Sequence, residues 1–372
     1  MANNFDSNFS RKIMDAFLDK FQSSRVLTKN IDTQLFAGKF NPSTGENIDI
    51  KRPTDYVSVR TAKGDVSGET ESSIVTGKAT ATVQDYFTVF VDYDEADEAL
   101  KMNQLDQLLA PMATRIATDF ETDYAKFMLK NTALLAGTVG TAITTWDHVA
   151  EAGAIMQATG VPMDGNWCMA VNPFVQRQLA SDQRSLGGET ANMTANQRAT
   201  ITDNFAGMKV LTATTLGTYT TGTGADRAGT IVGTPVATYV AAKDTMTQVI
   251  GVTAFQANLV VAAGETVTIT GRNRLNLSTR EPMIDDTGAV VVWTATVTAA
   301  VTLDGSGAGN LTVTGPGIFE AAGQYNTVDS ALTAGDVITL GGAATTIIQP
   351  NLFWHKQAFT CASVPIKKLQ AT

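Results

Sequence analysis

The sequence predicts an α+β protein in which an all-β segment interrupts a mixed body of helices and strands. Three observations support this prediction. Apolar residues recur at helical spacing over about residues 103–130. Shorter helix-like and strand-like segments alternate over about 140–216. From about 231 to 344 the chain has only short runs rich in threonine and valine, joined by glycine turns and without helical periodicity.

The composition limits the classes of protein to which the chain can belong. Its 372 residues suggest two or three domains. Charged residues make up 17% of the chain and the net charge is −9, with no basic stripe. Because nucleic-acid affinity comes mostly from Lys and Arg on phosphates, we expect no specific DNA binding. Cys168 and Cys361 are the only cysteines, so a disulfide framework is not expected.

Targeting signals are not evident in the sequence. The first 21 residues lack the apolar core of a signal peptide. A membrane-spanning helix would need a run of about 18 apolar residues, and the sequence contains no such run. We therefore expect that the protein does not associate with a membrane. We also expect that it is synthesised in a reducing cytoplasm.

The N-terminal part predicts a short helix and a long polar loop. Residues 9–22 have helical spacing, with Ser10 as a cap. An irregular, edge-like strand follows over 40–60, interrupted by Pro53. The segment 61–78 is polar and contains glycine, and it is longer than the loops that compact domains usually carry. We expect this loop to have a function or to contact a partner.

A long strand and a long helix come next in the sequence. Residues 79–91 are β-branched and aromatic, which predicts one strand. The acidic run 92–98 lies where a helix would begin, and carboxylates there interact favourably with the helix dipole. The helix ends near Lys130, and Pro111 kinks it or marks its first turn. Its apolar positions are Leu105, Leu108, Leu109, Met112, Ile116, Phe120, Tyr124 and Phe127.

The next layer is predicted to alternate helix and strand. "TWDHVAEAGAIMQATG" predicts a helix that stops at Gly160, "NWCMAVNP" a buried strand, "NPFVQRQLAS" a helix and "GMKVLTATTL" a strand. The Gly/Thr linker at 217–230 is the clearest change of composition. Strand-like sequence that includes Phe353 and Trp354 resumes after 344. The simplest organisation is therefore an inserted β-domain whose two ends lie in linkers that tolerate insertion.

No set of residues in the sequence resembles an active site. The acidic run fails as a calcium loop, because Asp97 and Asn103 stand where glycine and glutamate are required. Asp147 and His148 are adjacent, but no serine or cysteine motif accompanies them, and a surface histidine early in a helix explains the pair. Cys168 is best explained as a small core residue. We expect no catalytic residues, no metal site and no cofactor.

The order of these segments resembles the major capsid proteins of tailed double-stranded DNA phages, which have the HK97-like capsid fold. More narrowly, it resembles the phage P22 coat protein family, whose insertion domain lies in the same place. The local similarity is carried by "YNTVDSALTAGDVITLGGAATTIIQPNLFWHKQAFTCASVPI", with its Asn–x–Phe–Trp turn and Ser–x–Pro strand. "MKVLTATTLGTYTTG" resembles the family's exit into the insertion.

The resemblance implies a division of the chain into named parts. The E-loop would occupy about 40–80 and the spine helix about 103–130. The insertion would be an antiparallel β-barrel or sandwich. The implied parts are an N-arm at 1–30, the E-loop and peripheral domain with the spine helix at 31–139, the first part of the axial domain at 140–223, the inserted β-domain at 224–345, and the axial return with the C-terminal end at 346–372.

The function implied by the resemblance is structural. Many copies, arranged as hexamers and pentamers, would form an icosahedral head in the virion, enclosing double-stranded DNA without binding it specifically. Portal and scaffolding proteins would be partners, and assembly would take place in the cytoplasm of the host bacterium. Two alternatives stay open at this point. One is an encapsulin-like compartment shell, and the other is a tail or surface adhesin with a β-sandwich module, which would leave the spine helix unexplained.

Charged residues of the N-arm and the polar loop are the predicted contacts between subunits. The loop residues have no core within one subunit into which they could be buried, and capsid E-loops meet a neighbouring subunit. The predicted interface residues are Arg11, Lys12, Lys63, Asp65, Glu69, Glu71 and Lys78.

Overall fold

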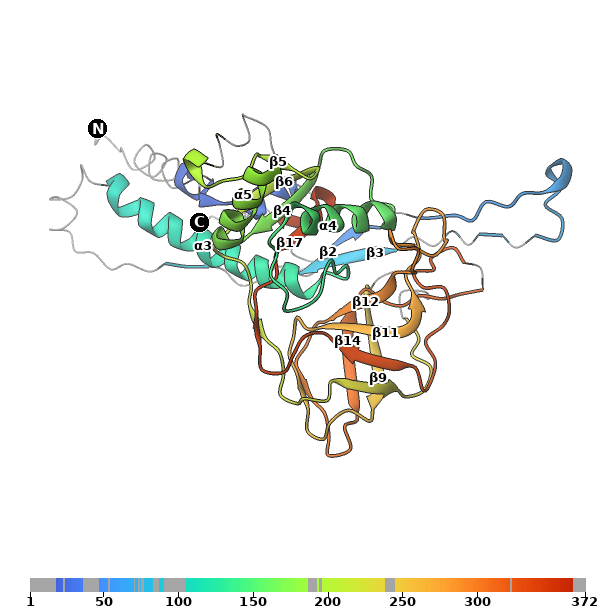
Figure 1. Ribbon diagram of the computed structural model, residues 1–372. Coiled ribbons are helices and arrows are strands. Elements are labelled where there is room, and N and C mark those ends of the chain that lie inside the picture. Colours follow the sequence, from blue (N-terminus) through green and yellow to red (C-terminus); the bar gives the residue numbers. More distant parts are fainter. Residues whose placement is uncertain are drawn as a thin grey trace, which may run out of the picture.

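The computed structural model shows a mixed α+β body, a β-barrel below it and an arm that extends to one side (Figure 1). In the described part of the chain no helix is both long and apolar enough to cross a membrane. The described residues are 18–22, 24–35, 47–52, 54–69, 71–72, 74, 77–82, 87–89, 105–186, 193, 196–237, 245–321 and 323–363.

A sheet of four strands in the order β17-β4-β6-β5 forms the centre of the body. Strand β4 (Trp167–Val171) is buried along its whole length, as its apolar sequence predicts. It pairs in parallel with β6 (Met208–Thr212) and antiparallel with β17 (Leu352–His355). Strand β5 (Asn204–Phe205) pairs antiparallel with β6 at the sheet edge.

Helices α4 (Trp146–Thr159) and α5 (Pro173–Leu186) share one buried core with this sheet. Thr145 is the N-cap of α4, and Gly160 ends the helix with a φ of 104°. Glycine adopts this left-handed conformation without the steric penalty of a side chain. Sequence and structure agree here, and the predicted helices and strands of this layer are all present. The shared core includes Val149, Ala152, Met156, Trp167, Met169, Leu179 and Met208.

The long helix α3 (Leu105–Lys130) buries a different face from the one marked by its large apolar residues. Ile116, Phe120 and Tyr124 are only half-buried, and Phe127 is 50% exposed. Three of the buried positions are alanines, and the chain approaches the helix backbone closely near one of them, since a Cβ on Gly217 would lie 3.6 Å from the Lys126 Cα. The buried positions are Ala113, Ala117, Glu121, Ala125, Met128 and Leu129.

Glu121 joins α3 to the N-terminal segment of the described chain. Its carboxylate accepts hydrogen bonds from the backbone N–H groups of Leu27 at 2.6 Å and Thr28 at 2.9 Å, and from the Thr28 hydroxyl. The carboxylate is 2% exposed, so these bonds replace its hydration. The 3₁₀ turn η1 (Thr28–Asn30) and strand β1 (Asp32–Leu35) follow, and β1 pairs in parallel with β18 (Thr360–Ser363).

The hairpin of β2 (Asn47–Lys51) and β3 (Lys78–Thr82) lies beside the body. The prediction of one strand over 79–91 is wrong at 87–89, which are not in a strand. Phe87 instead packs edge-on against Phe120, with the ring centroids 6.1 Å apart. A strand also needs a pairing partner, which local composition does not reveal. Of the predicted N-terminal helix, residues 18–22 are helical, and 9–17 and the acidic run lie outside the described residues.

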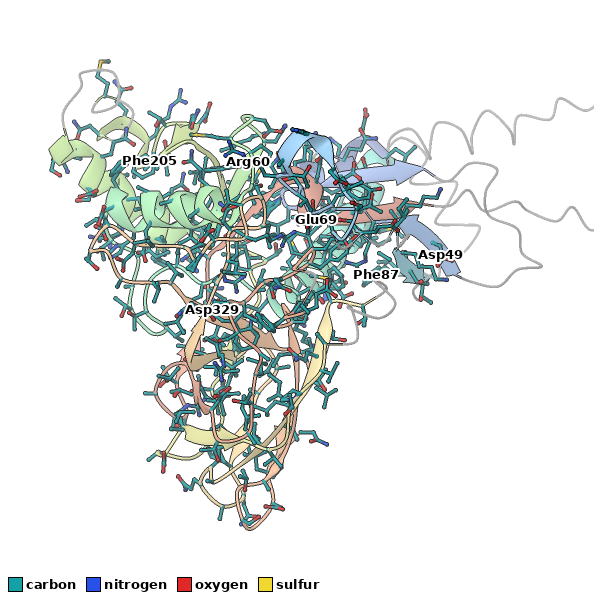
Figure 2. The ribbon with its side chains drawn as sticks, turned by 90° about the vertical axis from the view of Figure 1, so that its right-hand side faces the viewer. Asp49, Arg60, Glu69, Phe87, Phe205 and Asp329 are labelled. Atoms are coloured by element: carbon teal, nitrogen blue, oxygen red, sulfur yellow. The ribbon has the colours of Figure 1, made fainter. Side chains whose placement is uncertain are left out.

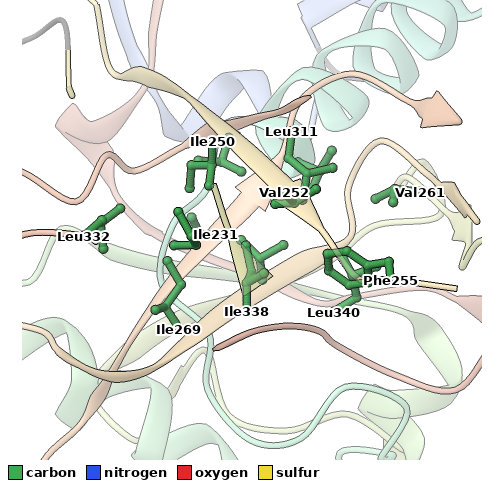
Figure 3. Packing of buried hydrophobic residues seen from close by; sticks show 14 of the residues in the cluster. Ile231, Ile250, Val252, Phe255, Val261, Ile269, Leu311, Leu332, Ile338 and Leu340 are labelled. Carbon is green, nitrogen blue, oxygen red and sulfur yellow. The ribbon is translucent and has the colours of Figure 1, made fainter. Parts of the chain in front are cut away.

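The all-β segment forms a closed barrel in the order β11-β12-β14-β9-β8-β15. All its pairings are antiparallel. Alternate residues of its strands fill one core, as the predicted period of two requires (Figure 3). The strands are β8 (Ala228–Ile231), β9 (Thr247–Thr253), β11 (Thr266–Asn273), β12 (Val292–Val297), β14 (Gly309–Thr314) and β15 (Val337–Leu340). The short pair β10 (Val260–Val261) and β13 (Val301–Thr302) lies next to them in sequence.

The two connections between barrel and body run side by side, because β7 (Tyr219–Thr220) pairs antiparallel with β16 (Ile347–Ile348). At this crossing Arg227 forms an ion pair with Glu265, whose side chain has no exposed surface. Glu265 also accepts hydrogen bonds from the N–H groups of Gly222 at 2.6 Å and Ala262 at 2.8 Å. A Cβ at Gly222 would overlap the Val260 carbonyl, so only glycine fits there.

We predict that Glu121→Gln destabilises the subunit. A glutamine amide has one accepting oxygen, and its NH₂ group would face backbone donors. The expected loss is about 1–3 kcal/mol of the free energy of unfolding, measured by urea denaturation of subunits. Asp119→Asn is the matched control, because Asp119 makes only an exposed pair with Arg115. Equal stability of the two variants would contradict the role given to Glu121.

We also predict that Glu265→Gln weakens the junction between barrel and body. It leaves the buried Arg227 guanidinium without a counter-charge, which typically costs about 3–5 kcal/mol. Calorimetry of subunits should show the barrel unfolding at a lower temperature than in the parent protein. Asp336→Asn, which breaks a more exposed pair with Arg272 in the barrel, should have the smaller effect, and the reverse order would refute this prediction.

Candidate subunit interface

Both histidines and the buried cysteine have structural contacts. His148 Nδ1 lies 3.0 Å from the Thr145 hydroxyl, in the N-terminal turn of α4. His355 Nδ1 accepts the N–H of Gln357 at 3.2 Å and thereby caps the 3₁₀ turn η5 (Lys356–Ala358). Cys168 is buried in the core, and burial raises the pKa of its thiol. Among the described residues, no group of histidine, cysteine and carboxylate side chains could hold a metal ion.

An arm, defined here as residues 52–77, connects β2 to β3 and extends away from the body (Figure 1). In Figure 2 the arm points toward the viewer, and its residues Arg60 and Glu69 lie in front of the body. The 3₁₀ turn η3 (Ala62–Gly64) forms part of the tip. Asp65 accepts bonds from the Ser67 hydroxyl at 2.6 Å and the Ser67 N–H at 2.9 Å, and these bonds lower the pKa of its carboxyl group.

Every apolar side chain among the described residues of the arm is exposed. Val66 is 69% exposed and Ile74 is 77% exposed. Tyr56, Val57 and Val59 are exposed as well. Between its two sides, the Val57 N–H donates to the Ser72 hydroxyl at 3.0 Å. Outside the 3₁₀ turn η3, the described residues of the arm form no helix or strand. Exposed apolar side chains of this kind are typical of surfaces that meet a partner.

The structure brings most of the predicted interface residues together on this arm. Lys63, Asp65, Glu69 and Glu71 are all exposed there. Lys78 differs, because it lies in β3 and forms an ion pair with Asp49 of the same hairpin at 2.9 Å. A cross-strand partner of this kind depends on strand register, which the sequence alone did not reveal. Arg11 and Lys12 lie outside the described residues.

A second surface was not recognised as an interface in the sequence. It is a chain of ring contacts along α3, here called the aromatic stripe, in which neighbouring ring centroids lie between 5.7 and 6.3 Å apart. The sequence pattern identified three of its members as the apolar face of the helix, but that face is only partly covered in the subunit. The stripe consists of Phe87, Phe120, Tyr124, Phe127 and Phe359.

Comparisons with solved structures find phage and virus-like-particle proteins at low similarity. A chain of Mycobacterium phage Che8 is 14% identical, with 85% of this chain and 86% of that chain covered and a TM-score of 0.35. The "CUS-3 coat protein I-domain" is 17% identical, with 31% and 95% covered and a TM-score of 0.22. A virus-like particle from Pyrococcus furiosus is 10% identical, with 92% and 98% covered and a TM-score of 0.31.

In sequence, the chain matches one family along its whole length. The family model described as "P22 coat protein - gene protein 5" matches residues 1–372. A major capsid protein of Acyrthosiphon pisum secondary endosymbiont phage 1 is 33% identical over 375 residues, which cover 100% of this chain and 88% of the relative. The chain therefore belongs to the P22 coat protein family of phage major capsid proteins.

Proposed function

We propose that this coat protein builds an icosahedral phage head from pentamers and hexamers, and that the arm and the aromatic stripe are contacts between neighbouring subunits. The observation that supports this best is the exposure of apolar residues on both surfaces of one subunit. In Figure 1 the arm leads away from α3, so a subunit cannot cover its own stripe with its own arm. We infer that the arm of one copy lies on the stripe of the next.

The proposed architecture is the HK97-like capsid fold with an insertion. In it, α3 is the spine helix, the arm belongs to the E-loop, and the sheet with α4 and α5 belongs to the axial domain. The paired connections β7 and β16 support an insertion at 224–345, because both lead into the barrel from one place. The other boundaries are an N-arm at 1–30, an E-loop and peripheral region at 31–139, and axial segments at 140–223 and 346–372.

The proposed contents of the shell follow from charge. The chain carries a net charge of −9, so a shell built from it would enclose double-stranded DNA without holding it by specific contacts. Portal and scaffolding proteins complete the proposed set of partners, and assembly takes place in the host cytoplasm. The protein has no enzymatic role in this proposal. The family match favours a phage head over a compartment shell or an adhesin.

Reversing one charge on the arm tests its role in assembly. Lys63 is exposed on the arm, so Lys63→Glu should leave the free energy of unfolding within about 0.5 kcal/mol of the parent. A misplaced charge at the contact should raise the subunit concentration required for shell formation by about tenfold, or about 1.4 kcal/mol. Sedimentation and electron microscopy would measure it. Lys78→Gln, which breaks an exposed pair within the subunit, is the control, and normal shells from Lys63→Glu would overturn the assignment.

Substitutions at two neighbouring residues of α3 should affect folding and assembly differently. Phe127 is half exposed, whereas Met128 is buried. Phe127→Ser should cost the subunit only about 1 kcal/mol through lost ring contacts, yet it should reduce shell yield strongly. Met128→Ala should cost about 2–5 kcal/mol of subunit stability. Urea unfolding and shell yield would be measured on both variants, and shells from Phe127→Ser at the parent concentration would rule out the stripe as a contact.

A further inference from the structure

One segment of the barrel, residues 274–280, contacts three separate parts of the body, and we call it the joint. The Arg274 guanidinium donates to the carbonyl of Ala133 at 2.9 Å, just after the end of α3. The Asn276 amide donates to the carbonyl of Ala158 at 2.7 Å, in the last turn of α4. At the other end of the joint, Arg280 forms an ion pair with Asp55, at the root of the arm.

The contact with the end of α3 is buried and closely packed. Arg274 is 8% exposed, and burial lowers the pKa of its guanidinium to about 10. It also donates to the Thr294 carbonyl at 2.6 Å, and the Thr294 hydroxyl donates to the Ala133 carbonyl at 2.7 Å. A Cβ at Gly315 would overlap the Ala133 side chain. The barrel is therefore held closely against Ala133, three residues beyond the end of α3.

The contact between the barrel and the arm is made at a single arm residue, Asp55. Asp55 receives the Arg280 guanidinium on its carboxylate and the Gln324 amide on its carbonyl oxygen. The Asp55 N–H in turn donates to the Tyr325 hydroxyl at 3.3 Å. Side chains of the barrel thus bind the carboxylate, the carbonyl and the N–H of one arm residue. Figure 1 shows the orange loops of the barrel beside the place where the arm leaves the body.

Arg280 itself has an unfavourable backbone conformation, with a φ of 60°. A non-glycine residue in this region typically costs about 1–3 kcal/mol and persists only where its surroundings hold it. Here the Arg280 N–H donates to the Asn276 carbonyl at 2.9 Å, and its guanidinium donates to the Asn326 carbonyl at 2.7 Å. The pair with Asp55 is partly exposed and contributes little to stability. Positioning the arm is a better explanation for this arrangement than stability.

We propose that the joint sets the direction of the arm by linking its root at Asp55 to the spine helix and to α4 through the barrel. An arm whose described residues form no strand pairing would otherwise swing about its root. The consequence for assembly rests on the proposed function of the arm. A subunit whose joint is broken would keep its folded barrel and body but present the arm in many directions.

Hydrogen exchange of unassembled subunits tests this proposal at residues 54–60. We expect Arg280→Asp to speed exchange there by about tenfold, the effect of losing roughly 1.4 kcal/mol of local protection. Tyr325→Phe, which keeps the buried ring but loses the hydroxyl, should change exchange in the same direction. The double variant Asp55→Arg/Arg280→Asp restores an ion pair of opposite polarity and should slow exchange again.

Arg272→Gln is the matched control, because Arg272 pairs with Asp336 at 2.7 Å within the barrel. It should leave exchange at 54–60 unchanged. The proposal is overturned if Arg280→Asp and Tyr325→Phe leave this exchange unchanged while the barrel melts at the parental temperature, or if Arg272→Gln accelerates it equally. If exchange rises as expected but shells still form normally, the joint is supported and the assembly role of the arm is refuted.

Discussion

The close approach of another backbone to one face of α3 is the constraint on which the rest of the subunit depends. Alanines at 113, 117 and 125 leave room on that face, and Glu121 supplies the acceptors that hold the N-terminal segment against it. That segment leads into β1, which pairs with β18 near the other end of the described chain. Since this face is used inside the subunit, the larger aromatic side chains of α3 remain only partly covered.

The barrel has a self-contained core but is tied to the body at several points. Paired linkers and the buried Arg227–Glu265 pair secure it where the chain passes in and out. The joint secures it again at the ends of α3 and α4 and at Asp55. If the arm contacts another subunit as proposed, this arrangement would present it in a defined direction before assembly, and such preorganisation lowers the cost of binding.

Much of the body could be predicted because its signals are local. The first turn of α4 at Thr145, its stop at Gly160 and the proline that opens α5 each act within a few residues. The apolar run of β4 predicted a buried strand for the same reason. Strands of the barrel showed their period of two, which depends only on the alternation of side chains along each strand. The polar loop was expected to be exposed because it had nothing to bury.

Most of the helices and strands could be predicted from the sequence, with 87–89 as an exception, whereas the surfaces that meet follow from the tertiary structure. Side-chain size suggested the wrong buried face for α3, because the approach of a distant backbone favoured alanine and Glu121 over phenylalanine. Strand register gave Lys78 a partner in its own hairpin. The joint pairs Arg280 with Asp55, which lie 225 residues apart in the chain. Contacts between residues this far apart produce no repeating pattern in the sequence, because propensity and spacing depend only on residues that are close along the chain.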